Sequence, residues 1–289
     1  MFKSLLLVAG TLFALVIAYS YYDRQFKLSN IKGNWPETYS ARIAPDQLPH
    51  LNETVSQPFY YLDRGKQSFV FISQDRKYVL KFFDNRCLRS GMLPFLFSIG
   101  KKKCSKKLKR LFEGYQIAQS HDATNAGLLF LQLAADPSNH LQVVVKDRFG
   151  LDHVINLSEV PFVIQEKAIP LRQLISSLLE KGNVEEAKFR FRQIIDMYVD
   201  EYQHGIFDSD HNFMYNTGFV DNRPLRIDLG RLRLEEAIKD PEVYEEDLEK
   251  IGIQRLGDWL ERHFPQYRKE ILEDMKSKLK EISVSKPQE

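Results

Sequence analysis

The chain has 289 residues, of which 43% are hydrophobic and 28% are charged, and its formal net charge at pH 7 is +2. These values are typical of a globular protein with room for one two-lobed domain or two small domains. The small net charge argues against a general nucleic-acid-binding protein, so we expect no nucleic-acid partner.

The first 22 residues form a segment of their own. After Lys3 an uncharged, mostly apolar run extends to Tyr22, and it is just long enough to cross a bilayer as a helix. We therefore expect a single-pass N-terminal membrane anchor over residues 1–22, which would make the membrane a partner. A signal peptide cleaved after Val16-Ile17-Ala18 is the alternative, and the protein would then be exported. Residues 23–54 contain several prolines and predict an irregular linker.

Aromatic and branched runs separated by polar turns predict a meander of three strands, over residues 59–62, 68–73 and 77–83. The turn between the first two strands contains Gly65. The third strand contains Lys81.

A basic stretch, Lys101 to Arg110, leads into a predicted helix that carries Glu113. Three interpretations of this stretch stay open: a solvated surface, a patch that meets anionic lipid, or recognition of an acceptor bearing phosphate or carboxylate. Cys87 and Cys104 could form a disulfide in an exported protein and would remain thiols in a reducing compartment. Their spacing gives no zinc signature.

Further strands are predicted over residues 127–133, 141–146 and 161–168. The pattern then becomes helical, with helices over residues 170–179 and 184–203 and further helices from about Glu242 to Glu281. On the second of these helices we expect the following residues to face the core: Phe189, Ile194, Ile195, Met197, Tyr198 and Tyr202.

The stretch from Tyr202 to Leu232 carries the most chemistry. Gly205 can end the preceding helix, because glycine adopts the left-handed conformation that closes a last turn. A polar loop follows, and then a predicted hairpin with strands at 218–220 and 225–227 and a turn at Asn222-Arg223-Pro224. Such a hairpin would bring Asn216 and Asp228, which flank it, close together.

This stretch resembles the catalytic core of protein kinases and of the small-molecule kinases of the aminoglycoside and choline type. Laid against their G-I-V-H-R-D-x-x-x-x-N pattern, Gly205 to Asp210 places Asp210 on the catalytic aspartate and Asn216 on the metal-binding asparagine. Asp228-Leu229-Gly230 falls on their D-F-G. Asp208 stands where the family has histidine, and the gap from Asp210 to Asn216 is one residue longer. Asp208 therefore remains a second candidate for the catalytic base.

The resemblance also implies roles for residues in the first half of the chain. Lys81, in Val79-Leu80-Lys81-Phe82, resembles the V-A-I-K lysine that contacts the nucleotide phosphates, and Glu113 is the residue best placed to pair with it. Gly65 matches one of the three glycines of the phosphate-covering loop. Gln165, Glu166 and Lys167 fall at the hinge, whose backbone pairs with adenine.

The resemblance implies an α+β, two-lobed protein-kinase-like fold, with an N-lobe over residues 55–166 and a C-lobe over residues 167–289 that contains the catalytic loop, 204–230. It implies transfer of the γ-phosphoryl group of ATP to a hydroxyl acceptor with Mg²⁺. Because no A-P-E-like signature follows Gly230, the activation segment is predicted to be short, as in small-molecule kinases. A pseudokinase that binds without transfer is one alternative, favoured by the single glycine of the loop. An exported interaction protein is the other.

Overall fold

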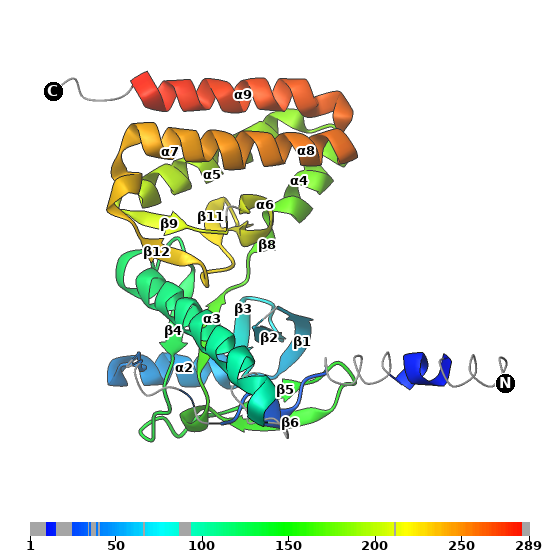
Figure 1. Cartoon of the computed structure of the whole chain (residues 1–289), viewed down its shortest axis with the longest axis vertical. Helices are drawn as coiled ribbons and strands as arrows, with labels where there is room; N and C mark the ends of the chain where they lie inside the picture. Colours follow the sequence, from blue (N-terminus) through cyan, green and yellow to red (C-terminus); the bar gives the residue numbers. More distant parts are fainter. Residues whose placement is uncertain are drawn as a thin grey trace. The chain divides into compact units, whose positions relative to one another are not determined.

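The computed structural model describes residues 10–15, 25–33, 35, 39, 41–65, 67–86, 94–210 and 212–284, without the side chains of residues 94–104, 251–252 and 283–284. So described, the chain divides into two compact units. Unit 1 comprises Met1–Lys101 and Gln132–Val163, and unit 2 comprises Lys102–Leu131 and Ile164–Glu289. The structure contains both a β-sheet and many helices, so the predicted α+β class is confirmed (Figure 1).

Unit 1 is built mainly from strands. The elements that lie wholly within it are short 3-10 helices at Leu28–Asn30, Pro45–Gln47 and Leu157–Glu159, α2 (Leu48–Val55), β1 (Phe59–Arg64), β2 (Ser68–Ser73), β3 (Tyr78–Phe83), β5 (Gln142–Lys146) and β6 (Asp152–Asn156). The elements in which the chain passes from one unit to the other are α3 (Pro94–His121), β4 (Leu128–Gln132) and β7 (Phe162–Glu166). The predicted N-lobe, 55–166, is thus divided between the units.

Seven of the described strands form one sheet in the order β4-β7-β3-β2-β1-β5-β6. The predicted meander of β1, β2 and β3 is present, with antiparallel pairing throughout. Along β2 the buried Phe69 and Phe71 alternate with half-exposed residues, as expected for a strand with one face on a core. Sequence analysis missed β6, which pairs with β5 and places Val154 opposite Val144, both exposed.

Part of the predicted linker is folded into unit 1. Ile43, Leu51 and Val55 are buried, and Leu51 and Val55 lie four residues apart on one face of α2. Because residues four apart on a helix share a face, this short helix buries an apolar stripe. Phe26 and Ile31, nearer the start of the lead-in, are buried as well, so the described lead-in is not an irregular tether.

The predicted N-terminal membrane anchor is not supported. The structure describes residues 10–15 of this segment, and the remainder of residues 1–22 lies outside the described residues. Among the helices that are described, none is long and apolar enough to cross a bilayer, which takes about 20 apolar residues. The prediction of a single-pass anchor is therefore wrong for the described chain.

The predicted alternatives for Cys87 and Cys104 were a disulfide or two thiols. Both side chains lie outside the described part of the chain.

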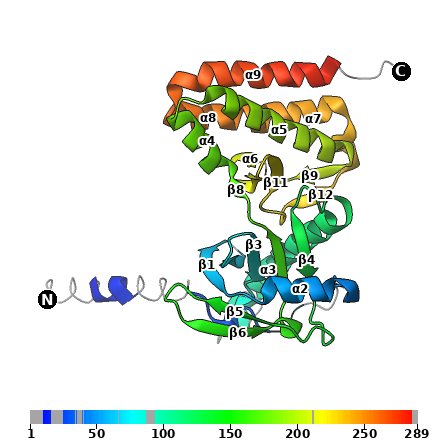
Figure 2. The same ribbon diagram turned by 180° about the vertical axis from the view of Figure 1, so that it is seen from behind.

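Unit 2 is mainly helical. Its elements after β7 are β8 (Ile169–Pro170), α4 (Leu171–Glu180), α5 (Val184–Gln203), β9 (Ile206–Asp208), α6 (Phe213–Asn216), β10 (Thr217–Val220), β11 (Arg223–Arg226), β12 (Leu232–Leu234), a 3-10 turn at Glu236–Lys239, α7 (Pro241–Leu248), a π-helical segment at Glu249–Gln254, α8 (Arg255–His263) and α9 (Pro265–Val284). Within this unit, α9 lies along α5, α7 and α8, on the side away from β9 and β12, in both views (Figures 1 and 2).

Helix α5 has the predicted bounds and lies at the centre of the unit 2 core. It begins after Gly182, whose φ of 71° is left-handed. Glu185 and Glu186 lie in its first turn, where their negative charges interact favourably with the positive end of the helix dipole. At its other end the N–H of Gly205, with φ of 75°, donates to the carbonyl of Tyr202. Gly205 therefore ends the helix as predicted.

One core prediction on α5 is wrong. Phe189 is 51% exposed, whereas Phe191 is fully buried among the core residues of unit 2. Two residues along an α-helix differ by roughly 200° in direction, so the two rings cannot both face the core. The other predicted core residues of this helix are buried, namely Ile194, Ile195, Met197, Tyr198 and Tyr202.

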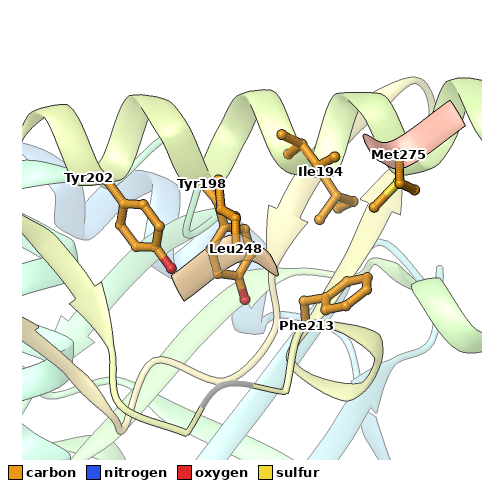
Figure 3. Close-up of a pocket in the computed structure, with 7 residues that line it drawn as sticks. Ile194, Tyr198, Tyr202, Phe213, Leu248 and Met275 are labelled. Carbon is orange, nitrogen blue, oxygen red and sulfur yellow. The ribbon is translucent and has the colours of Figure 1, made fainter. Parts of the chain in front are cut away.

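A small apolar cavity of about 20 Å³ lies in this core. Ile194, Tyr198 and Tyr202 of α5 line it together with Phe213, Leu248 and Met275 (Figure 3). The Tyr202 hydroxyl donates to Asp247, so its polar end is already bonded. An apolar cavity of this size is a packing defect, not a site that could orient a polar ligand.

The contrast between Phe189 and Phe191 gives a matched test of this core. Phe191→Ala should lower the free energy of unfolding by about 3–5 kcal/mol, because it leaves a cavity where a fully buried ring had been. Phe189→Ala, the same change on the same helix, should alter it by less than about 0.5 kcal/mol. Urea unfolding of both variants checks this, and equal losses would contradict the observed orientation of α5.

Candidate functional site

The hairpin of β10 and β11 brings the ends of the predicted site together. Thr217 lies opposite Arg226, and the residues that flank this pair continue the approach. The carbonyl oxygen of Asn216 accepts the N–H of Ile227 at 2.6 Å and the N–H of Asp228 at 3.3 Å. Asn216 and Asp228 are therefore neighbours, as the sequence predicts.

The turn of this hairpin differs slightly from the prediction. Asp221, with φ of 52°, and Asn222 form it, while Arg223 and Pro224 already belong to β11. β11 lies at the edge of its sheet, in the order β11-β10-β8. A proline is tolerated there because an edge strand does not need every N–H for pairing.

Asn216 also connects the acidic residues of the predicted catalytic loop. Its Nδ2 donates to Oδ2 of Asp208 and to Oδ2 of Asp210, each at 3.4 Å. Oδ1 of Asp208 accepts the backbone N–H of Asp210 at 2.9 Å. Asp208 is almost completely buried, whereas Asp210 is half-buried. The two carboxylates thus share a partner but differ in their access to solvent.

Asp228 lies at a tight turn that is held by its own side chain. Its Oδ1 accepts the backbone N–H of Gly230 at 3.0 Å, and Asp228 itself is exposed. Tyr115 of α3 lies close to it: burial raises the pKa of the Tyr115 hydroxyl, and the Asp228 carboxylate raises it further. The C-terminal part of α3 therefore packs beside the Asp228-Leu229-Gly230 turn within unit 2.

Glycine permits this close packing. A Cβ on Gly114 would overlap the carbonyl oxygen of Leu229, and a Cβ on Gly230 would overlap the side chain of Leu111. Backbone and side chain approach each other at these positions more closely than any larger residue would allow. Helix α3 can contact the turn because residue 114 has no side chain.

These residues fit a magnesium ion. The Nδ2 of Asn216 faces carboxylates, which directs its Oδ1 elsewhere, and Asp228 keeps Oδ2 beyond the atom that binds Gly230. Amide and carboxylate oxygens are ligands that Mg²⁺ prefers, and it commonly takes one or two protein ligands together with substrate phosphates. Among the described residues no group of three His, Cys, Asp or Glu side chains is placed to hold a metal.

The predicted hinge residues make several contacts within unit 2. Nε2 of Gln165, which is buried, donates to the carbonyls of Ala126 at 2.7 Å and Arg226 at 3.4 Å. Glu166 pairs with Arg223, and its backbone N–H donates to the carbonyl of Gly127. Burial lowers the pKa of Lys167, whose Nζ donates to the Ala168 carbonyl. The Gln165 and Glu166 side chains thus hold local structure, and a role of this segment with adenine stays a prediction.

The other predicted nucleotide-binding residues are placed as follows. Lys81 is buried on β3 of unit 1. Gly65 lies in the β1–β2 turn of the same unit, and its N–H donates to the Ser68 carbonyl at 2.9 Å. Glu113 belongs to unit 2, where it forms an ion pair with Lys109 one turn earlier on α3. The expected Lys81–Glu113 pair therefore joins residues of different units and stays a prediction.

Sequence analysis missed a buried group of charged residues beside the loop. Arg226 is fully buried and contacts Asp208 and Glu201, and Asp122 lies next to Glu201. The only signal in the sequence was a basic residue inside the apolar run Leu225-Arg226-Ile227, two positions before Asp228. Glu201 and Asp122 gave no signal, because charged residues usually face solvent.

No protein-family model and no curated protein matches the sequence. Similar solved structures include WbdD with a kinase inhibitor (11% identity, TM-score 0.40, 76% of this chain and 45% of that chain), WbdD at 12% identity (TM-score 0.39, 76% and 45%), and the bifunctional kinase-methyltransferase WbdD at 13% (TM-score 0.37, 89% and 49%). This chain thus spans just under half the length of these proteins. At these TM-scores the likeness carries no functional argument, so the function must be inferred from the chain's own residues.

The contact at Gly114 predicts that replacing this glycine by alanine destabilises the protein, whereas the same change elsewhere in a helix usually stabilises it. In a free helix, Gly→Ala is stabilising by roughly 0.5–1 kcal/mol. Here we expect Gly114→Ala to lower the free energy of unfolding by about 1–3 kcal/mol, because the methyl group overlaps the Leu229 carbonyl. Thermal unfolding measures it, with the exposed Gln119→Ala on the same helix as a control that should change little. A stabilised Gly114→Ala variant would show that α3 and this turn do not touch.

Asp122 predicts a pH dependence of stability. Burial raises the pKa of its carboxyl from 3.8 to about 8, and the negative charge of Glu201 contributes to the shift. Between these two values the folded protein keeps a proton that the unfolded chain releases, so the free energy of unfolding falls as pH rises through this range. Asp122→Asn, which mimics the protonated acid, should flatten the fall in Tm between pH 5 and pH 8.

The control for this measurement is Glu180→Gln, an exposed carboxylate at the end of α4. It should leave the pH dependence of Tm as in the wild type. If Asp122→Asn also leaves it unchanged, Asp122 is not protonated in the folded protein.

Proposed function

We propose that this chain is a protein-kinase-like phosphotransferase that moves the γ-phosphoryl group of ATP to a hydroxyl acceptor with Mg²⁺. One observation carries the proposal: Asn216 joins the loop carboxylates Asp208 and Asp210 through its side chain and Asp228 through its backbone carbonyl. Phosphoryl transfer needs such a set, with an amide and a carboxylate for the metal and a second carboxylate for the acceptor.

The surroundings of the two loop carboxylates favour Asp210 as the base. Oδ1 of Asp208 accepts from Asp210, its Oδ2 accepts from Asn216 and Arg226, and the side chain is almost completely buried. An acceptor hydroxyl cannot readily reach it. Asp210 is half-buried, so its carboxylate can orient the hydroxyl and take its proton.

Asn216 and Asp228 are the proposed metal ligands. Magnesium, when bound, would neutralise charge on the β- and γ-phosphates. Asn216 is held by its bonds to both loop carboxylates and to the strand that leads to Asp228, so its amide oxygen is fixed in direction. Metal ligands fixed in this way contribute to catalysis because they need no rearrangement during the reaction. Lys81 and Gly65 of unit 1 as nucleotide contacts, and Glu113 as the partner that holds Lys81, remain part of the proposal.

A pseudokinase is the second candidate, and one observation favours it. The N–H of Gly65 is already bonded within its own turn, to the Ser68 carbonyl. A glycine-rich loop binds phosphate through backbone N–H groups that remain available. A loop with one glycine whose N–H is used internally would hold a nucleotide weakly.

Thermal unfolding with ATP and Mg²⁺ tests the nucleotide site. A ligand that binds only the folded protein stabilises it, by about 2.7 kcal/mol at a hundredfold excess over Kd, so the wild-type Tm should rise by several degrees. Asp228→Asn should remove the magnesium-dependent part of this rise, because it exchanges a charged metal ligand for an amide that can still accept from Gly230. Asp221→Asn makes the same chemical change at the exposed turn of this hairpin and should keep the full rise.

The outcomes separate the candidates. A wild-type protein that shows no shift at millimolar ATP with Mg²⁺ is not a kinase. A shift that persists in Asp228→Asn removes the metal assignment. A magnesium-dependent shift without any ATP turnover, measured with water or simple alcohols and sugars as acceptors, favours the pseudokinase.

A further inference from the structure

Arg226 is the largest fully buried side chain of the described residues and has three kinds of partner. Its Nε donates to Oε1 of Glu201 at 2.6 Å, and its Nη2 donates to Oε2 of the same carboxylate. Its Nη1 donates to Oδ2 of Asp208 at 2.9 Å. The guanidinium lies 4.3 Å from the ring centroid of Tyr198. The bidentate contact and the stacking fix the orientation of the guanidinium plane.

The backbone of Arg226 is held as well. Its N–H donates to the carbonyl of Asn125 at 2.7 Å, and its carbonyl accepts from Gln165. Glu201 belongs to α5, a 20-residue helix at the centre of the unit 2 core. Arg226 thus connects the buried helix α5 to the catalytic loop, and it does so two residues before Asp228.

The connection continues through Asp208 to both proposed functional residues of the loop. Asp208 accepts from Arg226 and Asn216 on Oδ2 and from the backbone N–H of Asp210 on Oδ1. A change in the direction of the Asp208 carboxylate would therefore move the backbone at Asp210 and the amide of Asn216 together. Neither residue needs to contact Arg226 itself.

A proton on Asp122 lowers the net negative charge of this buried group from two to one. Oδ2 of Asp122 is buried and accepts from no donor among the described residues, yet its carboxyl lies within hydrogen-bonding reach of Glu201. Two carboxyl groups can form such a bond only if one of them carries a proton. The raised pKa of Asp122 agrees with this geometry. A protonated Asp122 leaves one guanidinium facing the carboxylates of Glu201 and Asp208.

We propose that Arg226 is a positioning residue that acts through Asp208 to fix Asp210 and Asn216 for phosphoryl transfer. The inference rests on the proposed function, since it assigns Arg226 a task in that reaction. It also explains the main departure of this chain from the kinase pattern. Asp208, which replaces the usual histidine, has its ion-pair partner in Arg226, so the loop is held by a buried charge pair.

Amide hydrogen exchange of the full chain, measured by mass spectrometry, tests the positioning directly. In the wild type, peptides that cover residues 206–217 should exchange slowly. Arg226→Lys, which cannot hold both carboxylates with one planar fork, should raise exchange in these peptides by about tenfold or more. Asp208→Asn is the second variant, in case Arg226→Lys fails to fold: it keeps an acceptor for Asp210 but presents an amide N–H₂ to Arg226 or Asn216.

The control for a general loss of stability is Ile271→Ala in the core of α9. It should lower Tm without a selective change in residues 206–217. The second readout is the Mg²⁺ concentration that gives half of the ATP-dependent rise in Tm. It should increase about tenfold or more in Arg226→Lys or Asp208→Asn and stay unchanged in Ile271→Ala, because only the first two displace Asn216.

The two proposals fail in different ways. Unchanged loop exchange in both Arg226→Lys and Asp208→Asn overturns the positioning role, whatever the nucleotide does. Faster loop exchange with an unchanged Mg²⁺ concentration for the half-maximal rise in Tm overturns it too. Arg226 would then stabilise the loop without affecting metal binding. If the Tm of the wild type does not respond to ATP and Mg²⁺ at all, the proposed function is wrong, and so is the role of Arg226 in phosphoryl transfer. The exchange measurement would still show whether Arg226 stabilises the loop.

Discussion

A guanidinium that is removed from water must be surrounded by anions, and this requirement shapes the centre of unit 2. Arg226 takes Glu201 from helix α5 and Asp208 from the loop as its counterions. Removing one partner of such a buried pair commonly lowers the free energy of unfolding by about 3–5 kcal/mol, because the remaining charge is left buried without a counterion or water. The loop is therefore tied to the helix core by electrostatics as well as by its short strand β9. Asn216 and Asp210 both donate hydrogen bonds to Asp208.

Local signals in the sequence predicted the parts of the site that depend on local structure. The hairpin of β10 and β11 follows from turn residues between two apolar runs, and this hairpin alone makes Asn216 and Asp228 neighbours. The meander of β1, β2 and β3 in unit 1 was likewise predicted locally, from aromatic and branched runs between polar turns. The wrong prediction at Phe189 shows the limit of local signals. Helical spacing predicts which face of a helix is buried, but the packing of the folded chain decides that Phe191 and not Phe189 lies in the core.

The buried charges could not be predicted, because their partners come from distant segments. Asp122 directly follows α3, Glu201 is near the end of α5, and Arg226 ends β11. A charged residue in a helix normally faces water, and nothing near Glu201 in the sequence indicates that this one does not. Only the fold brings the three groups together. The same holds for the choice between Asp208 and Asp210, since sequence alignment left both as candidates and burial distinguishes them.

Gly114 has a consequence for finding relatives of this chain. A glycine inside a long helix lowers helix stability by roughly 0.5–1 kcal/mol, so it persists where a close contact requires it. Here the contact is with the turn that holds Asp228, more than a hundred residues later in the chain. A glycine inside a helix rich in lysine, followed at a distance by a hairpin and Asp-x-Gly, is thus a long-range pattern with a physical reason. Chains too divergent for family models could be recognised by testing whether they carry both halves of it.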